Sequence, residues 1–263
     1  MNARSRTEPA WPPRLALLAG GMATRLYPLS LDTPKSMMRV AGEPFIAHQL
    51  RWFRSSGLRE IVICCGHLCC QIQNFAGDGS RFGLHIQYSH DGEHPLGTGG
   101  AIRAALPLLG RRFLIMYGDS WLAEPIEPIW RAFRNSGKPA LMTVLRNDNR
   151  WAASNVEHHN GTILRYDKHN PSPAMHSIDY GLSAMESDVL ARWRSRTFDL
   201  AEVWSSLAAS GHLAAYEVRS RFYEIGSLTG LRETEAVITA AQALPRLQPS
   251  PVPLTTRTHE VLE

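Results

Sequence analysis

The chain has 263 residues, 44% of them hydrophobic and 20% charged, with a formal net charge of +4, which predicts one large globular α/β domain. Lys and Arg are scattered, with no basic run interleaved with aromatic residues, so we expect anionic small substrates and no nucleic acid. No stretch reaches the about 18 apolar residues of a membrane helix, and no apolar segment follows the charged N-terminus, which predicts a cytoplasmic protein without a membrane anchor or signal peptide.

Apolar strands and helical patterns alternate through the first half of the chain. We expect strands at 15–19, 60–65, 84–89, 113–117 and 141–145, and helices at 45–54, 69–75, 101–109 and 126–134. Strands separated by helices in this rhythm predict a mainly parallel sheet with right-handed crossovers.

The second half has a different pattern. Asn160 and Gly161 separate two short strand patterns, 156–158 and 163–166, which predicts a hairpin. Further strands are expected at 178–185 and 213–218, and helices at 189–193, 200–209 and 229–241. We therefore expect a loose N-terminal arm (1–13), a single domain (14–247) made of two halves (14–150 and 151–247), and a loose C-terminal tail (248–263).

The four cysteines cluster as Cys64, Cys65, Cys69 and Cys70, with His67 between the pairs. Thiolates and an imidazole this close could bind zinc, but adjacent pairs lack the usual Cys-x-x-Cys spacing and no second cluster completes a site. Burial in the strand at 61–65 favours structural packing. In a reducing cytosol we expect no disulfide, and whether the cluster binds anything stays open.

The stretch from Leu18 to Lys35 has the features of a triphosphate site. An apolar strand runs into Gly20 and Gly21, whose missing Cβ atoms let backbone N–H groups approach anionic oxygens. Arg25 then offers a planar fork of donors, and Lys35 offers a compact charge after Pro34. Neither the dinucleotide fingerprint Gly-x-Gly-x-x-Gly nor a P-loop is present.

A carboxylate follows another apolar strand. The strand at 113–117 ends in Gly118, Asp119 and Ser120. Ligands of open parallel sheets bind beyond the carboxyl ends of the strands, so Asp119 is expected on the same edge as Gly20 and Gly21. From the residues alone, a simple turn aspartate is an equal alternative.

The string from Gly20 to Lys35 resembles the signature of the sugar-1-phosphate nucleotidylyltransferases, the nucleoside-diphosphate-sugar pyrophosphorylases. It departs at Ala23, where the family usually has Gly, and conservatively at Ser30. The matching positions are Gly20, Gly21, Thr24, Arg25, Leu26, Pro28, Leu29, Pro34 and Lys35. The resemblance covers about residues 14 to 240 and implies the nucleotide-diphospho-sugar transferase fold. In this fold a Rossmann-like, mainly parallel mixed α/β sheet is flanked by helices and has a smaller sugar-binding β portion. Residues 14–150 would then form a nucleotide-binding half and residues 151–247 a sugar-binding half.

The resemblance also implies a role for each matched residue. Arg25, Lys35 and Asp119 would be catalytic, and Mg²⁺ would be held by Asp119 and by Glu224, where the family usually has Asp. The block that begins at Glu93 resembles the family's segment against base and ribose. The implied nucleotide-binding residues are Leu18, Ala19, Gly20, Gly21, Thr24, Arg25, Pro95, Leu96, Gly97 and Thr98, and the implied sugar-phosphate residues are Lys168, Asn155, Tyr180 and Gly181.

By this resemblance, the chain would join a nucleoside triphosphate and a sugar 1-phosphate into a nucleotide sugar and pyrophosphate. The block from Glu93 to Gly100 is most similar to the heptose- and mannose-1-phosphate guanylyltransferase branch, which favours GTP. A uridylyltransferase acting on a hexose 1-phosphate is an alternative. A second alternative, suggested by Ala23 and Glu224, is a nucleotide-sugar-sensing regulatory subunit without catalysis. Homo-oligomerisation is left open.

Overall fold

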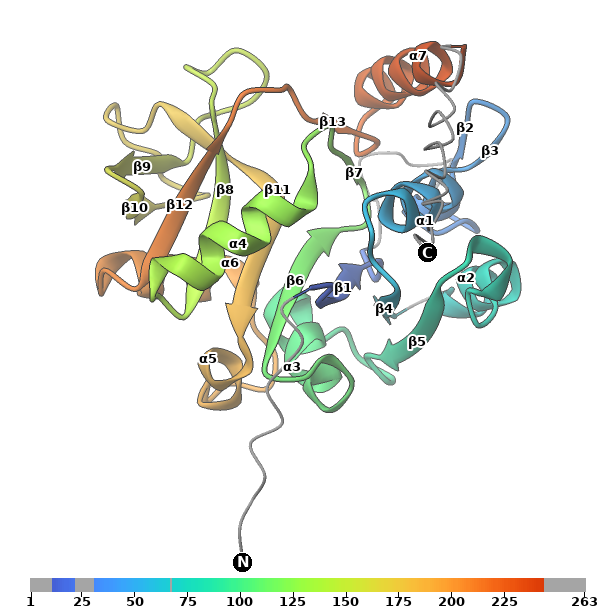
Figure 1. Cartoon of the computed structure of the whole chain (residues 1–263), viewed down its shortest axis with the longest axis horizontal. Helices are drawn as coiled ribbons and strands as arrows, with labels where there is room; N and C mark the ends of the chain where they lie inside the picture. The colour runs from blue at the N-terminus through green and yellow to red at the C-terminus, as the bar shows by residue number, and fades with distance from the viewer. Residues whose placement is uncertain (1–10, 22–30, 67, 244–263) are drawn as a thin grey trace, which may run out of the picture.

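The computed structural model describes residues 11–21, 31–66 and 68–243. A nine-stranded mixed sheet forms its centre, in the order β5-β4-β1-β6-β11-β8-β12-β10-β9 (Figure 1). Its strands are β1 (Arg14–Leu18), β4 (Glu60–Cys65), β5 (His85–His90), β6 (Arg112–Tyr117), β8 (Ala140–Arg146), β9 (Val156–His159), β10 (Thr162–Tyr166), β11 (Ser177–Glu186) and β12 (Leu213–Val218). This architecture confirms the predicted fold class.

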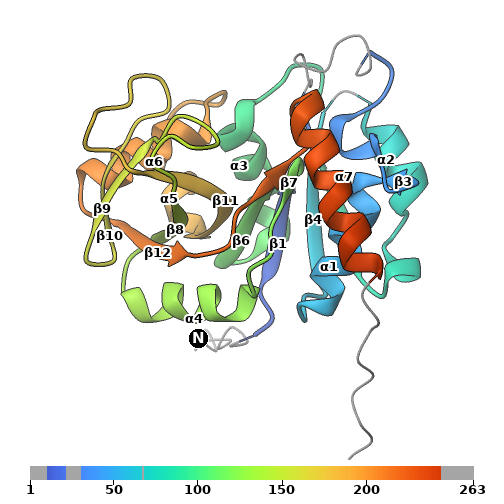
Figure 2. The ribbon, with the colours of Figure 1, turned by 90° about the horizontal axis from the view of Figure 1, so that it is seen from above.

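Helices cover both faces of the sheet. They are α1 (Phe45–Ser55), α2 (Cys69–Ala76), α3 (Gly97–Leu109), α4 (Ile126–Ser136), α5 (Ser187–Ala191), α6 (Leu200–Ala209) and α7 (Leu228–Ala243). Figure 2 shows α3 and α6 on one side of the sheet and α1 and α4 on the other. Alternate strand residues therefore point into two separate cores: Leu15 and Leu17 pack with α1, α2 and α4, whereas Ala16 packs with α3, α5 and α6.

The strand directions agree with the predicted parallel crossovers, except that one antiparallel strand, β11, is inserted in the sheet. Strands β5, β4, β1 and β6 are parallel, as are β8 and β12. Strand β11 lies between β6 and β8 and is antiparallel to both. A strand from late in the sequence thus joins the two parts of the sheet.

The expected helices and long strands occur, and most bounds differ by only a few residues. β4, α6 and β12 have the expected bounds, while α3 begins at Gly97, four residues earlier than predicted. The predicted hairpin is confirmed: Asn160 and Gly161 both have positive φ, 47° and 72°, as a two-residue type I′ turn requires.

Among the described residues, the sequence pattern missed four two-residue strands and two 3-10 helices. The strands are β2 (Arg39–Val40), β3 (Glu43–Pro44), β7 (Ser120–Trp121) and β13 (Tyr223–Glu224), and the 3-10 helices are η2 (Lys35–Met37) and η3 (Ser80–Phe82). Segments of two or three residues are too short to show a periodic pattern. Two of the missed strands, β7 and β13, nevertheless hold predicted site residues together.

At the N-terminus, the ring of Trp11 packs against Gly57, where a Cβ would lie 3.1 Å from the indole nitrogen. Residues 1–10 of the predicted arm and the whole predicted tail lie outside the described residues. Within the described ranges, no helix has the length and apolar character needed to cross a membrane.

Candidate active site

The site begins where the central strands β1 and β6 end side by side. The N–H of Gly118, after β6, donates to the carbonyl oxygen of Leu18 at the end of β1, at 2.9 Å. A Cβ on Gly118 would lie 2.7 Å from this oxygen, so only glycine fits. This close approach brings Ala19 and Gly20 to the same sheet edge as Asp119, as the sequence predicts.

The short ladder between β7 and β13 places the two predicted metal ligands next to each other. Ser120 pairs with Glu224, and the N–H of Ile225 donates to the carbonyl oxygen of Asp119 at 3.0 Å. Lys35, the first residue of η2, reaches the same point, and its Nζ lies 2.7 Å from Oδ2 of Asp119. The Lys35 and Asp119 side chains are 16% and 28% exposed, so this ion pair is screened less than a surface pair.

Glycines accommodate the longer side chain of Glu224. Its carboxylate folds back and accepts hydrogen bonds from the N–H of Gly226 and from the hydroxyl of Ser227, the latter at 3.0 Å. A Cβ on Gly226 or on Gly230 would come closer to this carboxylate than real Cβ atoms do. Nζ of Lys35 lies 2.9 Å from the same Cβ position on Gly226, so the ammonium and the carboxylate converge there.

Two cavities meet at this cluster. The first has a volume of about 470 Å³ and the second about 650 Å³. Both are lined by Tyr117, Asp119 and Lys168. Of the other predicted residues, the first cavity is lined by Leu18, Ala19, Gly20, Gly21, Lys35, Pro95, Gly97 and Thr98, and the second by Asn155, Tyr180, Gly181 and Glu224.

Two of the predicted residues, Leu96 and Tyr180, have packing contacts in the core. Leu96 is buried, does not line either cavity, and its carbonyl oxygen accepts a hydrogen bond from Phe198. Tyr180 is buried in the core, where its hydroxyl accepts from the N–H of Ala123 at 3.4 Å, so it serves as a wall of the second cavity. Thr24 and Arg25 lie outside the described residues.

The glycines at the start of α3 have a packing reason that the sequence did not show. A Cβ on Gly97 would clash with the carbonyl oxygen of Phe198, and one on Gly99 would clash with the Phe198 ring. Thr98 is also used structurally, because its hydroxyl accepts from the N–H of Leu200 at 2.8 Å. The block thus packs α3 against the segment before α6, while three of its residues, Pro95, Gly97 and Thr98, line the first cavity.

Two polar side chains of the second cavity, Asn155 and Asp179, are held by hydrogen bonds to backbone N–H groups. Oδ1 of Asn155 accepts from the N–H of Asp179 at 3.1 Å, and Oδ1 of Asp179 accepts from the N–H of Gly181 at 2.9 Å. Burial raises the pKa of Asp179 to about 6, although the Lys168 charge acts in the opposite direction. This carboxyl group therefore titrates close to neutral pH.

An aromatic and basic group in the second cavity was not anticipated. Arg221 lies between Trp151 and Tyr223, with its guanidinium carbon 5.2 and 5.0 Å from the two ring centres. Glu233, on α7, forms an ion pair with Arg221. Trp151 is far from Arg221, Tyr223 and Glu233 in the sequence, so no local pattern predicts that they meet.

In the first cavity, the unanticipated side chain is Asp91, which directly follows β5. Its position at the carboxyl end of a parallel strand is a signal that could have found it. Burial raises the pKa of Asp91.

The cysteines do not all behave as predicted. Cys64 is buried and lines the first cavity, and burial raises the pKa of its thiol to about 12, which keeps it protonated. Cys65 and Cys69 form a disulfide, contrary to the expectation, because the turn between β4 and α2 brings their Cα atoms to 5.4 Å. Cys70 is exposed and free, so the core packing expected for the cysteines does not apply to it.

Comparisons with known proteins agree with this geometry. A family model described as "Nucleotidyl transferase" matches residues 16–155. The mannose-1-phosphate guanylyltransferase catalytic subunit beta of Xenopus tropicalis is 26% identical over an alignment of 226 residues. This alignment covers 82% of this chain and 62% of the relative. The N-acetylmuramate alpha-1-phosphate uridylyltransferase of Neisseria meningitidis is 43% identical over 104 residues, 39% of this chain and 45% of the relative.

The chain thus spans less than two thirds of the length of these curated relatives. Among solved structures, HddC from Yersinia pseudotuberculosis complexed with GMP-PN has the same fold, with a TM-score of 0.73 and 19% identity over 86% of this chain and 100% of that one. Because the family model matches more than half of the residues and the fold agrees, the chain belongs to the nucleotidyl transferase family.

Proposed function

We propose that this chain transfers a nucleotidyl group from a nucleoside triphosphate to a sugar 1-phosphate, giving a nucleotide sugar and pyrophosphate. The observation that carries the proposal is the junction of the two cavities at Tyr117, Asp119 and Lys168. A reaction between two bound anions needs adjoining compartments and positive charge where they meet. The glycine-rich edge suits the triphosphate, and the polar cavity beyond it suits a sugar.

The residues at the junction fit a hard divalent cation. Asp119 and Glu224 are brought to this junction by the ladder between β7 and β13, and Mg²⁺ binds one or two carboxylates in many phosphate-processing sites. Asp119 and Glu224 would hold Mg²⁺, which when bound would offset negative charge on the phosphates. The folded-back Glu224 carboxylate, held by Gly226 and Ser227, has a fixed orientation for this role.

The lysines supply fixed positive charge on both sides of the junction. Lys35 pairs with Asp119 in the structure and can turn its ammonium toward the α-phosphate. Lys168 lines both cavities and is 54% exposed, in reach of a sugar phosphate. A phosphate oxygen is already ionised at neutral pH, so the reaction requires no general base and depends on positioning and electrostatic stabilisation.

The favoured substrate pair is GTP with a mannose- or heptose-type 1-phosphate. The name of the Xenopus relative, which matches most of this chain, supports this pair. The uridylyltransferase name of the Neisseria relative, over a shorter but more similar stretch, supports UTP as the alternative. We expect Mg²⁺ as the cofactor and a cytoplasmic setting.

A substrate panel tests the proposal. Pyrophosphate release is measured with Mg²⁺ across the four NTPs, each with the 1-phosphates of mannose, a heptose, glucose and N-acetylmuramate. We expect turnover with one pair well above the others. Turnover with no pair, together with measurable nucleotide-sugar binding, would instead support the sensing subunit.

Substitution of Asp119, the carboxylate at the junction, distinguishes a loss of catalysis from a loss of folding. Asp119→Asn should abolish turnover while the thermal melting curve stays close to that of the parent chain. Asp188→Asn makes the same change at an exposed position of α5 and should leave the rate intact. Near-full activity of Asp119→Asn would show that the metal assignment is wrong.

A further inference from the structure

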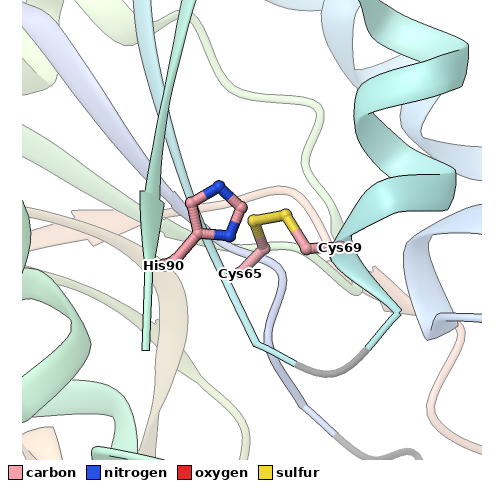
Figure 3. A group of neighbouring side chains, drawn as sticks. All are labelled: Cys65, Cys69 and His90. Carbon is pink, nitrogen blue, oxygen red and sulfur yellow. A yellow bond between two sulfur atoms is a disulfide. The ribbon is translucent and has the colours of Figure 1, made fainter. Parts of the chain in front are cut away.

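A second group of metal-ligating side chains lies beside the first cavity. Cys65 ends β4, Cys69 begins α2, and His90 ends β5. Their ligand atoms all lie within 4.8 Å of one another, and Figure 3 shows the imidazole with one nitrogen turned toward the two sulfur atoms. The two cysteines are buried and the histidine is exposed, so solvent reaches the group from one side.

The fold itself creates this group. The parallel register of β4 and β5 sets Cys65 directly beside His90. Leu68, in the left-handed region with φ 62°, turns the chain so that α2 starts at Cys69. Gln73, one turn further along α2, has its side-chain amide 3.2 Å from Nε2 of His90. When this amide turns its oxygen to Nε2, the oxygen accepts the Nε2 proton and leaves Nδ1 as the unprotonated nitrogen for a ligand. Contacts of this kind orient metal-bound histidines.

The donor set differs in kind from the carboxylates of the reaction site. Two thiolates and an imidazole are soft and borderline donors that select Zn²⁺ over Mg²⁺. We propose that the reduced chain binds one thiophilic divalent cation of the Zn²⁺ class through Cys65, Cys69 and His90, with a fourth coordination position open on the exposed side. This site is independent of the proposed reaction.

Binding follows reduction of the disulfide. Two electrons and two protons convert the Cys65–Cys69 bond into two thiols, while a thiol reductant, such as a small dithiol, becomes oxidised to its own disulfide. The cation then displaces the two thiol protons, which pass to solvent. The pair therefore has two states, a disulfide without metal and a metal thiolate.

Either state stabilises a wall of the first cavity. Gly66 follows Cys65, and its backbone nitrogen lies 3.2 Å from the Cβ position of Gly20. Asp91, which lines the cavity, follows His90 and donates its N–H to the carbonyl oxygen of Cys65 at 3.1 Å. The metal site is thus connected through backbone contacts to the edge where the triphosphate is expected.

Cobalt provides the test, because Co²⁺ replaces Zn²⁺ and only thiolate ligation gives a sulfur-to-cobalt charge-transfer absorption. The full chain is reduced with a phosphine, separated from it, and titrated with Co²⁺ and then with Zn²⁺. We expect the band to saturate at one equivalent and to disappear as Zn²⁺ is added. The oxidised chain should give no band, and Co²⁺ at the carboxylates would not produce one.

Variants assign the ligands. Cys69→Ser should abolish the band, His90→Ala should weaken cobalt binding at least tenfold, and Cys70→Ser, at the exposed neighbouring cysteine, should leave both unchanged. His90 is exposed, so its replacement keeps the fold and remains informative if a cysteine variant misfolds. Absence of the band in the reduced parent chain, or equal loss in Cys70→Ser, overturns the proposal.

Discussion

Gly226 is the position at which the arrangement of the proposed metal ligands can be tested most sharply. A Cβ there would come within 3.0 Å of both Oε2 of Glu224 and Nζ of Lys35. The three nearest atoms to this Cβ all belong to those two side chains, and Gly226 is not among the glycines with positive φ. Gly226→Ala should therefore displace the ligand without straining the backbone.

The size of the effect follows from the displacement. To reach an ordinary contact distance the carboxylate oxygen must retreat by roughly 1 Å, a misplacement that can cost on the order of 100-fold in rate. At a backbone conformation open to alanine, the substitution also removes unfolded-state entropy worth about 0.4–1 kcal/mol, which offsets lost contacts. We expect turnover to fall about 100-fold, and the melting temperature to change little.

The assay is pyrophosphate release as a function of Mg²⁺ concentration, together with direct titration of Mn²⁺ by its electron paramagnetic resonance signal. Weaker Mn²⁺ binding should accompany the loss of rate. Glu224→Asp withdraws the carboxylate by one methylene, so adding Gly226→Ala to this variant should cost much less than it does alone.

Gly230→Ala is the contrasting control. Its Cβ would clash with the backbone carbonyl oxygen of Glu224 as well as with the carboxylate, so this variant should lose stability. If Gly226→Ala keeps the parent rate and Mn²⁺ affinity, or if its effect simply adds to that of Glu224→Asp, Glu224 is not the ligand.

Two other predictions concern the second cavity. Because burial raises the pKa of Asp179 to about 6, its carboxylate forms as pH rises through that value. Sugar hydroxyls donate stronger hydrogen bonds to an ionised carboxylate than to a protonated one, so binding of a nucleotide sugar, whose diphosphate diester does not titrate there, should strengthen with pH. Asp179→Asn should remove this pH dependence in calorimetric titrations, and a pH dependence that persists in the variant contradicts the assignment. Trp151→Ala removes a cation–π contact worth about 0.5–1 kcal/mol, so KM for the sugar phosphate should rise about two- to fivefold while KM for the NTP stays constant. Trp151→Phe should retain most of the affinity, and equal changes in both KM values would argue against a sugar-side role.

The elements with a long periodic pattern were predictable. The strand 60–65, the helix 200–209 and the strand 213–218 have the expected bounds because their apolar spacing and flanking residues agree. Asp119 and Gly20 could be placed on one edge because parallel strands end together. The motif and the strand topology thus define the part of the site that we propose for the nucleotide.

The remainder depends on contacts between distant segments. Nothing local to Glu224 predicts its ladder with Ser120, because β7 and β13 are two residues each. The stack of Arg221 on Trp151 likewise joins separate loops. The disulfide was missed because the expectation rested on the cell compartment, whereas the turn geometry at Leu68 brings Cys65 and Cys69 together.

The insertion of β11 between β6 and β8 has a consequence for the chain during its synthesis. Both neighbours leave the ribosome before β11 does, so until then one edge of β6 has unpaired N–H and C=O groups that invite non-native pairing. Nascent chains halted before residue 177 should remain sensitive to protease, and those extended through β13 should become resistant. We therefore expect ribosome-bound intermediates of this protein to bind chaperones, and folding to be completed late in translation.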